Sequence, residues 1–263
     1  METPRTALKA IGIDLQTPLC FEPIEGHALE FMPFASVLTK ADYYKAVREY
    51  ILKILYSFAE RGVEFISMDG VIISPFAIIG EGTVIHPNTE IRSGVTIGDR
   101  CVIGPCSIIE QSNIGSDCVI NATQIYNSTL ENDVKTGPFC HIRPGSYLHT
   151  GVRIGDFVEI KNSTVGEGTH ASHLTYIGDS DVGMRVNFGC GVVTVNYDGE
   201  NKYRTVIGDN AFIGCNTNLI APVKVGDGAY TAAGSTITDD IPESALAIAR
   251  ARQVNKPGWK RKI

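Results

Sequence analysis

Aliphatic residues recur every sixth position along most of this chain. One series consists of isoleucine alone, at Ile79, Ile85, Ile91, Ile97, Ile103 and Ile109. A second series runs through Ile207, Ile213, Leu219, Val225, Thr231 and Ile237. Between them, with two steps shortened from six to five, lie Leu148, Ile154, Ile160, Val165, Ala171, Ile177, Val182 and Phe188. The residue that follows the aliphatic position is often glycine.

A period of six fits neither a helix nor alternating hairpin strands. It suits short strands that are each turned by a small residue into the next, so that three strands close a coil of roughly 18 residues. Stacked coils bury one another's apolar faces at a spacing of about 4.8 Å. The pattern therefore predicts an all-β protein, a parallel β-helix over residues 71–241. A β-sandwich is the alternative, but its turns come every 8–12 residues.

Two segments interrupt the six-residue period of aliphatic positions. Residues 110–136 keep apolar positions at irregular spacing, and residues 196–206 (NYDGENKYRTV) are too long and too polar for one side of a coil. We expect the second segment to project from the prism as a loop. Parallel crossovers are normally right-handed, but the period itself does not fix the hand.

The two ends differ from the repeats. Residues 40–61 place apolar side chains on one helical face, which predicts an amphipathic helix capping the first coil, with a partner-binding helix as the alternative. We therefore divide the chain into an N-terminal extension (1–70), the repeats (71–241) and a basic tail (242–263). The function of residues 1–38 stays unassigned. The tail predicts either a solvated end or a contact to a polyanionic ligand through Arg250 or Arg252.

Composition excludes several classes of protein. The net charge of −6 argues against a nucleic-acid partner, whose binding sites are basic. No apolar run reaches the ~20 residues of a membrane span, and the first residues lack a secretory signal, so we expect a cytoplasmic protein without a membrane partner. The seven cysteines are then expected to be reduced.

Candidate chemistry is densest between residues 141 and 204. Arg143 and Lys161 are 18 residues apart, so they should stack on the same edge of the prism. Two adjacent cations indicate a phosphate site, with two solvated surface cations as the alternative. His173 follows Lys161 by 12 residues, two sides round the coil, and lies beside a turn, where a neutral imidazole can accept a proton from an attacking amine or hydroxyl. A purely structural histidine is the competing interpretation.

Two further chemistries are considered. His170 and His173 raise the possibility of a metal site, but the cysteines offer no matching tetrahedral set, and no metal is expected for the reaction. A cysteine nucleophile is conceivable at Cys190 or Cys215. Neither has a base close by in the sequence to activate it.

The motifs RPG, FVEIK, HLTYIGD, VNFG and NYDG…NK occur in this order. On these motifs the chain, over residues 60–260, resembles the acetyltransferase domain of the bifunctional glucosamine-1-phosphate acetyltransferase/N-acetylglucosamine-1-phosphate uridyltransferase family. The resemblance implies a left-handed β-helix that assembles as a homotrimer, with active sites between neighbouring prisms. It also implies acetyl-CoA as co-substrate and direct transfer to an amino-sugar phosphate.

The resemblance assigns roles to individual residues. His173 would be the general base, and Arg143 and Lys161 would bind the sugar phosphate. The rest of the sugar site would consist of Tyr176, Asn187 and Lys202. The coenzyme would contact Cys190, Asn196, Tyr197, Cys215, Ala233 and Arg250.

This chain also departs from the family pattern. The family usually has alanine at the position of Cys190 and serine at that of Cys215, and commonly glycine at that of Ser172. The glycine-rich nucleotide loop of the uridyltransferase domain has no counterpart in residues 1–60, so we expect no uridyltransferase activity, which leaves a separate uridyltransferase chain as a conceivable partner. The leading hypothesis is an N-acetyltransferase for glucosamine 1-phosphate. The alternatives are another sugar acceptor, or a non-catalytic trimeric scaffold that binds a sugar phosphate or nucleotide sugar.

Overall fold

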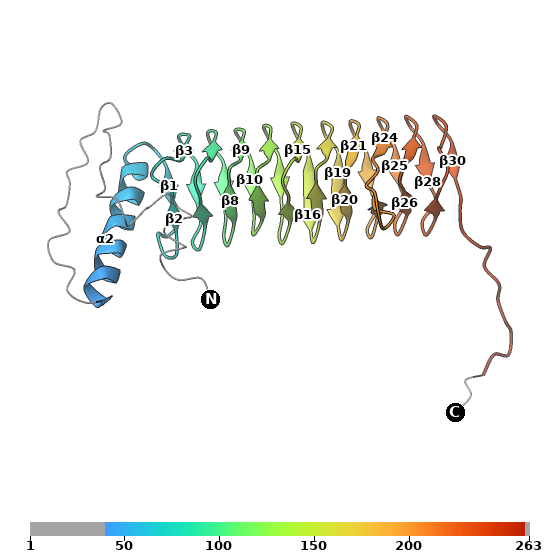
Figure 1. Cartoon of the computed structure of the whole chain (residues 1–263), viewed down its shortest axis with the longest axis horizontal. Coiled ribbons are helices and arrows are strands. Elements are labelled where there is room, and N and C mark those ends of the chain that lie inside the picture. Colours follow the sequence, from blue (N-terminus) through green and yellow to red (C-terminus); the bar gives the residue numbers. More distant parts are fainter. Residues whose placement is uncertain (1–39, 261–263) are drawn as a thin grey trace.

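The structure, a computed structural model, describes residues 40–260, and the N-terminal segment 1–39 and residues 261–263 lie outside the described part. The chain winds into a long triangular prism whose three faces are parallel β-sheets (Figure 1). Each turn contributes one short strand to sheet A, then one to sheet B, then one to sheet C. The predicted parallel β-helix is confirmed.

The strands of the three sheets are as follows. Sheet A contains β1 (Glu64–Phe65), β4 (Val84–Ile85), β7 (Val102–Ile103), β10 (Val119–Ile120), β13 (Lys135–Thr136), β16 (Arg153–Asp156), β19 (His170–His173), β22 (Asn187–Phe188), β25 (Phe212–Ile213), β28 (Tyr230–Thr231) and β30 (Leu246–Ala247). Sheet B contains β2 (Ile72–Ile73), β5 (Glu90–Ile91), β8 (Ile108–Glu110), β11 (Gln124–Tyr126), β14 (His141–Ile142), β17 (Glu159–Lys161), β20 (Tyr176–Gly178), β23 (Val193–Val195), β26 (Asn218–Ile220) and β29 (Thr236–Ile237). Sheet C contains β3 (Ile78–Ile79), β6 (Thr96–Ile97), β9 (Asn113–Ile114), β12 (Thr129–Leu130), β15 (Tyr147–Leu148), β18 (Thr164–Val165), β21 (Ser180–Val182), β24 (Thr205–Ile207) and β27 (Val223–Val225).

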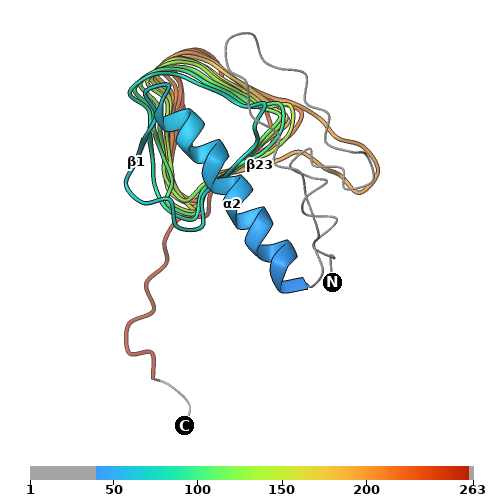
Figure 2. The same ribbon diagram turned by 90° about the vertical axis from the view of Figure 1, so that its left-hand side faces the viewer.

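The helix is left-handed, as the family resemblance implies. Figure 2 looks along the prism from its N-terminal end, and there sheets A, B and C follow one another counterclockwise as the coils recede. We call the three long edges of the prism by the sheets that meet there: the A–B edge, the B–C edge and the C–A edge. Every turn crosses each edge once, so side chains at equivalent turn positions form rows along an edge.

The six-residue period marks the residues that point inward. All six isoleucines of the first series are buried, from Ile79 to Ile109. Thr231, the polar member of the second series, is also buried. Its hydroxyl is 3.0 Å from that of Thr217 and accepts a hydrogen bond from the Gly214 N–H at 2.9 Å. A buried hydroxyl with partners carries little penalty, so threonine is accepted in the core.

The expectation that residues 110–136 interrupt the coil is wrong. Strands β9 to β13 continue all three sheets through this segment, and the inward positions are Ile114, Ile120, Ile125, Leu130 and Thr136. Three of the steps from Ile109 to Leu130 are five residues, because a turn at an edge can lose one residue while the strands keep their register.

Helix α2 (Lys40–Ala59) precedes the strands and covers the first coil (Figure 2). Its side chains Ile54, Leu55 and Phe58 are buried in the same core as the first strands. The turn that follows the helix contains Gly62 at φ 89°, a backbone conformation that glycine adopts without strain. The predicted amphipathic cap is therefore confirmed. Within the described residues, no helix is long and apolar enough to cross a membrane.

Residues 196–204 leave the prism at the B–C edge, between β23 and β24, and form the projecting loop that was predicted (Figure 2). Tyr197 and Lys202 make an antiparallel bridge across the loop, and Asp198 accepts hydrogen bonds from the N–H groups of Glu200 and Asn201. The guanidinium of Arg204 binds Asp181 and the Ser180 carbonyl, which anchors the returning strand to the preceding coil.

Glycines along the C–A edge set how closely the coils stack. A Cβ added to Gly166 would fall on the backbone carbonyl of Gly183 in the next coil. The same edge position is occupied by glycine in most turns: Gly80, Gly98, Gly115, Gly183, Gly208 and Gly226.

We expect Gly166→Ala to lower the melting temperature, because the new methyl group forces two stacked coils apart. Overpacking of this kind costs about 2 kcal/mol, which corresponds to roughly 6 °C for a chain of this size. The neighbouring exposed Glu167 provides the control, since Glu167→Ala should leave the melting temperature nearly unchanged. Calorimetry of the two variants checks this, and equal melting temperatures would show that the edge has room for a methyl group.

Candidate functional site

His173 ends β19 at the A–B edge and pairs with a carboxylate of the preceding coil. Strand register places Asp156 and His173 side by side, and the Nδ1 atom of His173 is 2.9 Å from Oδ1 of Asp156. A hydrogen bond from its own backbone N–H, followed by the one with His173, holds the pKa of Asp156 below its ordinary value. The carboxylate therefore stays charged near neutral pH and orients the imidazole.

The row that contains His173 continues toward the C-terminus. The pairing of Ala171 with Phe188 places Cys190 in the next coil at the position equivalent to His173. The pairings that follow place Cys215 and then Ala233 in the same row. Arg250 lies one coil further, 3.8 Å from where a Cβ of Gly234 would be. Four of the six residues expected to bind the coenzyme thus lie along one edge with the expected base.

Arg143 and Lys161 stack as predicted, but on the other side of sheet B, at the B–C edge. Each already has a carboxylate partner. Arg143 Nη1 is 2.7 Å from Glu159 Oε1, and Lys161 Nζ is 3.0 Å from Asp179 Oδ2. The first pair is well exposed, whereas the side chains of Lys161 and Asp179 are only 18% and 7% exposed.

Asp179 is the centre of a cluster of hydrogen-bonded polar side chains at this edge. Its carboxylate accepts hydrogen bonds from Lys161, from Asn162 at 2.6 Å and from Asn196. Burial alone raises the pKa of Asp179, but the hydrogen bonds from Asn162, Lys161 and Asn196 outweigh that effect and leave its pKa below the ordinary value. Asn196, expected to contact the coenzyme, here fixes the base of the projecting loop.

The remaining expected site residues lie at the B–C edge, on the loop that projects from it, and on sheet A. The ring of Tyr176 lies over Gly178, so its hydroxyl is close to the B–C edge. Tyr197 and Lys202 project from that edge on the loop. Asn187 lies on sheet A, between His170 and Phe212.

One chain does not bring His173 together with Arg143 and Lys161. From His173 to Asp179 the chain crosses the whole width of sheet B, six residues or about 20 Å of extended backbone. The two halves of the predicted site are therefore separate in a single prism. Among residues 40–260, no group of three or more His, Cys, Asp or Glu side chains could hold a metal ion.

Sequence reasoning missed Asp156 and Asp179. Both could have been found from the coil length, because Asp156 precedes His173 by 17 residues and Asp179 follows Lys161 by 18. The stacking rule that linked Arg143 to Lys161 applies to Asp156 and His173, and it places Asp179 one residue beyond Gly178, which is in register with Lys161.

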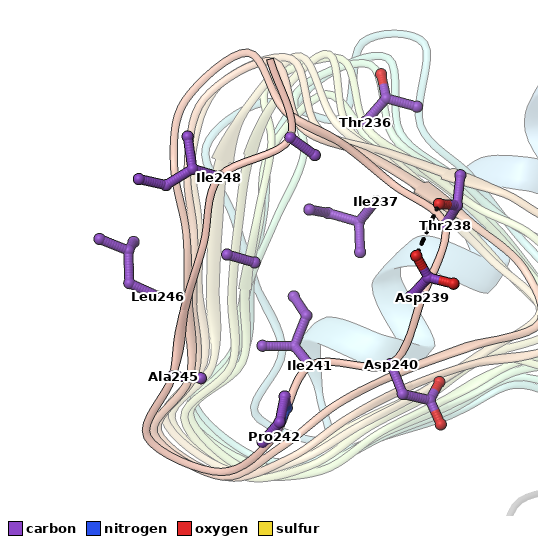
Figure 3. A pocket seen from close by; sticks show the side chains of 12 residues that line it. Thr236, Ile237, Thr238, Asp239, Asp240, Ile241, Pro242, Ala245, Leu246 and Ile248 are labelled. Carbon is purple, nitrogen blue, oxygen red and sulfur yellow. Dashed lines mark hydrogen bonds between the residues drawn. The ribbon is translucent and has the colours of Figure 1, made fainter. Parts of the chain in front are cut away.

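A hollow of about 230 Å³ lies at the C-terminal end of the prism, away from both edges just described (Figure 3). Ile237 and Ile241 point into it, and Leu246 and Ile248 lie on its outer wall (Figure 3). It is the open interior of the last coil, where the next coil of a longer helix would stack.

Comparison with known proteins finds the same six-residue repeats. Residues 76–111, 127–162 and 204–239 match the family described as bacterial transferase hexapeptide (six repeats). A protein of Halalkalibacterium halodurans named bifunctional protein GlmU is 55% identical over 196 residues, 74% of this chain and 43% of the relative. A Clostridium kluyveri protein of the same name is 48% identical over 230 residues, 88% of this chain and 50% of the relative.

The chain thus spans about half the length of the curated relatives it matches. Among solved structures, an Arabidopsis UDP-N-acetylglucosamine acyltransferase aligns with a TM-score of 0.59 at 18% identity, covering 68% of this chain and 69% of that one. This likeness shows the shared β-helix fold.

We expect Asp179→Asn to destabilise the fold, because it leaves the buried ammonium group of Lys161 without a carboxylate. Breaking a buried ion pair by removing one partner costs about 3 kcal/mol. Since the folded pKa of Asp179 is depressed, its contribution is complete above the unfolded pKa of about 4 and is lost as the pH falls through the folded value. Urea unfolding from pH 7 downward should therefore show the two proteins converging in acid. A constant difference at all pH values would contradict the assignment.

Proposed function

Because this chain matches the acetyltransferase part of the bifunctional GlmU proteins and carries bacterial hexapeptide transferase repeats, we propose that it is an acetyl-CoA-dependent N-acetyltransferase. The acceptor in this proposal is an amino-sugar phosphate, glucosamine 1-phosphate, and the product is N-acetylglucosamine 1-phosphate. The observation that carries the proposal is the paired Asp156 and His173 at the head of the row with Cys190, Cys215 and Ala233.

His173 is the general base in this proposal. Asp156 holds Nδ1, so Nε2 is the nitrogen left to accept a proton from the acceptor amine as it attacks the thioester carbonyl. Asp156 also favours the imidazolium that forms in this step. Binding both substrates beside one base supplies much of the acceleration, because it replaces an encounter in solution.

Arg143 and Lys161 bind the phosphate of the acceptor in this proposal. The exposed pair of Arg143 with Glu159 contributes little free energy, so the guanidinium can turn to a phosphate at small cost. Lys161 stays bound to Asp179 and supplies a fixed positive end at the same edge. Tyr176 and Lys202, which belong to this edge and its loop, would contact the sugar, and Asn187 would contact it from sheet A of a second copy.

The active site of the proposal is completed by a second copy of the chain. In a homotrimer, the A–B edge of one prism faces the B–C edge of its neighbour, which unites His173 with the cations across a cleft. Phe139 and Phe157 support this arrangement. They stack at 5.3 Å on the A–B edge and are 62% and 56% exposed, and exposed aromatic pairs mark contact surfaces.

A different amino or hydroxy sugar is the second candidate acceptor. Both cations already have carboxylate partners, so a neutral sugar would bind without displacing either of them. A non-catalytic trimeric scaffold would use the same edges without transferring the acetyl group. In either case the proposed setting is the cytoplasm, where acetyl-CoA is made available to soluble enzymes.

The proposed function predicts release of CoA thiol when the protein is given acetyl-CoA and glucosamine 1-phosphate. His173→Ala should lower kcat by roughly 10²- to 10⁴-fold, because the amine loses its proton acceptor. His170→Ala, three residues earlier on the same strand, is the matched control and should keep its activity. Equal rates for glucosamine and its 1-phosphate would favour the second acceptor class. Binding of the sugar phosphate without any thiol release would favour the scaffold.

The two-chain site predicts that inactive variants restore each other. Homotrimers of His173→Ala and of Arg143→Ala are mixed, dissociated and reassembled, and the mixed trimers then contain some clefts with both edges intact. Random assembly of a cyclic trimer gives roughly a quarter of such sites, so activity should rise to about that share of wild type. A mixture no more active than its parents would place each site within one chain.

A further inference from the structure

The C-terminal end of the prism is open. Strands β29 and β30 are the last of their sheets, so each pairs with one strand only and its outer edge has no partner strand among residues 40–260. Inside this rim lies the hollow of about 230 Å³, into which Ile237 and Ile241 point (Figure 3). The opposite end differs, because helix α2 covers the first coil with Leu55 and Phe58. A stack of repeats needs a cap at both ends, and the described residues supply one of the two.

The tail of the chain does not cover this end. Residues 251–260 run away from the prism (Figure 1). The two large apolar side chains of the tail, Val254 and Trp259, are 77% and 74% exposed, whereas a segment seated on the hollow would bury them. The hollow therefore stays uncovered within one chain.

Opposite charges lie at two different edges of the open end. Asp239 and Asp240 are exposed at the B–C edge, just after β29. Arg250 and Arg252 are exposed where the tail leaves the A–B edge, with Arg250 beside Gly234. From Gly234 to Asp239 the chain crosses sheet B, five residues or about 17 Å of extended backbone. None of these four charged side chains forms an ion pair within residues 40–260.

We propose that a second copy of the chain caps the open end, turned end to end about a two-fold axis. Helix α2 blocks the other end of the prism, so copies cannot stack head to tail and the two open ends meet. A two-fold axis through the middle of sheet B and the C–A edge places the A–B edge of each copy over the B–C edge of the other. Arg252 of each copy then faces Asp239 of the other, and the two β29 strands meet in antiparallel directions.

This contact combines apolar burial with charge. The two hollows, each lined by Ile237 and Ile241, close over one another and remove apolar surface from water. The free edge of each β29 is a template for pairing with the other. The reciprocal acids and cations fix how one prism is rotated on the other. Because both copies use the same surface, the pair is closed and leaves no end for a third copy.

The end contact is compatible with the homotrimer of the proposed function. In that trimer the A–B and B–C edges of each prism face its two neighbours, so the line from the threefold axis passes through the middle of sheet B and the C–A edge. This line is also the two-fold axis of the end contact. Two trimers can therefore stack prism on prism to give six chains with D3 symmetry. The number six rests on the proposed function, whereas the doubling does not.

Native mass spectrometry and light scattering of the full chain test the doubling. Wild type should have twice the mass of Asp239→Arg and of Arg252→Asp, because in each of these variants like charges meet across the ends. The double variant with both substitutions should recover the wild-type mass, since the pair is restored with its signs exchanged. Glu60→Arg is the matched control, because it makes the same change of charge on an exposed residue beside the capped end. It should keep the wild-type mass.

Equal masses of wild type and both single variants overturn the inference, and this is the result expected if the chain's own tail covers the hollow in solution. Assemblies that grow beyond a doubling as concentration rises overturn it as well, because a closed pair cannot extend. Two chains in wild type and one in the single variants would support the end contact and refute the homotrimer. Thiol release is measured on the same samples, and its absence from wild type refutes the proposed function while leaving the end contact in place.

Discussion

The structure depends on one constraint, which is that every coil must stack on the next at the spacing of paired parallel strands. Residues such as Gly166 leave no room for a Cβ between coils, and the inward isoleucines fill a cross-section of constant size. A side chain therefore has one neighbour above and one below at the same turn position. The arrangement of the candidate site follows from this rule, because stacking brings residues that are 17 or 18 positions apart in the sequence into neighbouring places.

The same rule separates the two halves of the site. Rows run along the prism, and nothing in the fold moves a residue from the A–B edge to the B–C edge. His173 and Lys161 consequently stay about the width of one sheet apart, however the coils are packed. At the B–C edge the cations differ in availability. Lys161 is fixed by a carboxylate that three donors share, whereas Arg143 has a single exposed carboxylate partner, so in the proposed function Arg143 would be the cation that a phosphate recruits.

Much of the fold and part of the candidate site could be predicted from the sequence, and what was missed has physical causes. The isoleucine period predicted the coil, and the spacing of 18 residues predicted the stacking of Arg143 on Lys161. Residues 110–136 were misinterpreted because a shortened turn changes the sequence spacing without changing the strand register. The separation of His173 from the cations also follows from the spacing, because the 12 residues after Lys161 correspond to two sides of the coil. Asp156 was missed although the coil length would have identified it.

The two edges of one prism therefore hold different groups. Asp156 and His173 lie at the A–B edge, and Arg143 and Lys161 lie at the B–C edge. In the proposed function, transfer to a phosphorylated sugar needs both sets, which one prism does not bring to the same place. Assembly of the chains would then complete the acceptor site, because a neighbouring prism supplies the edge that the first prism turns away.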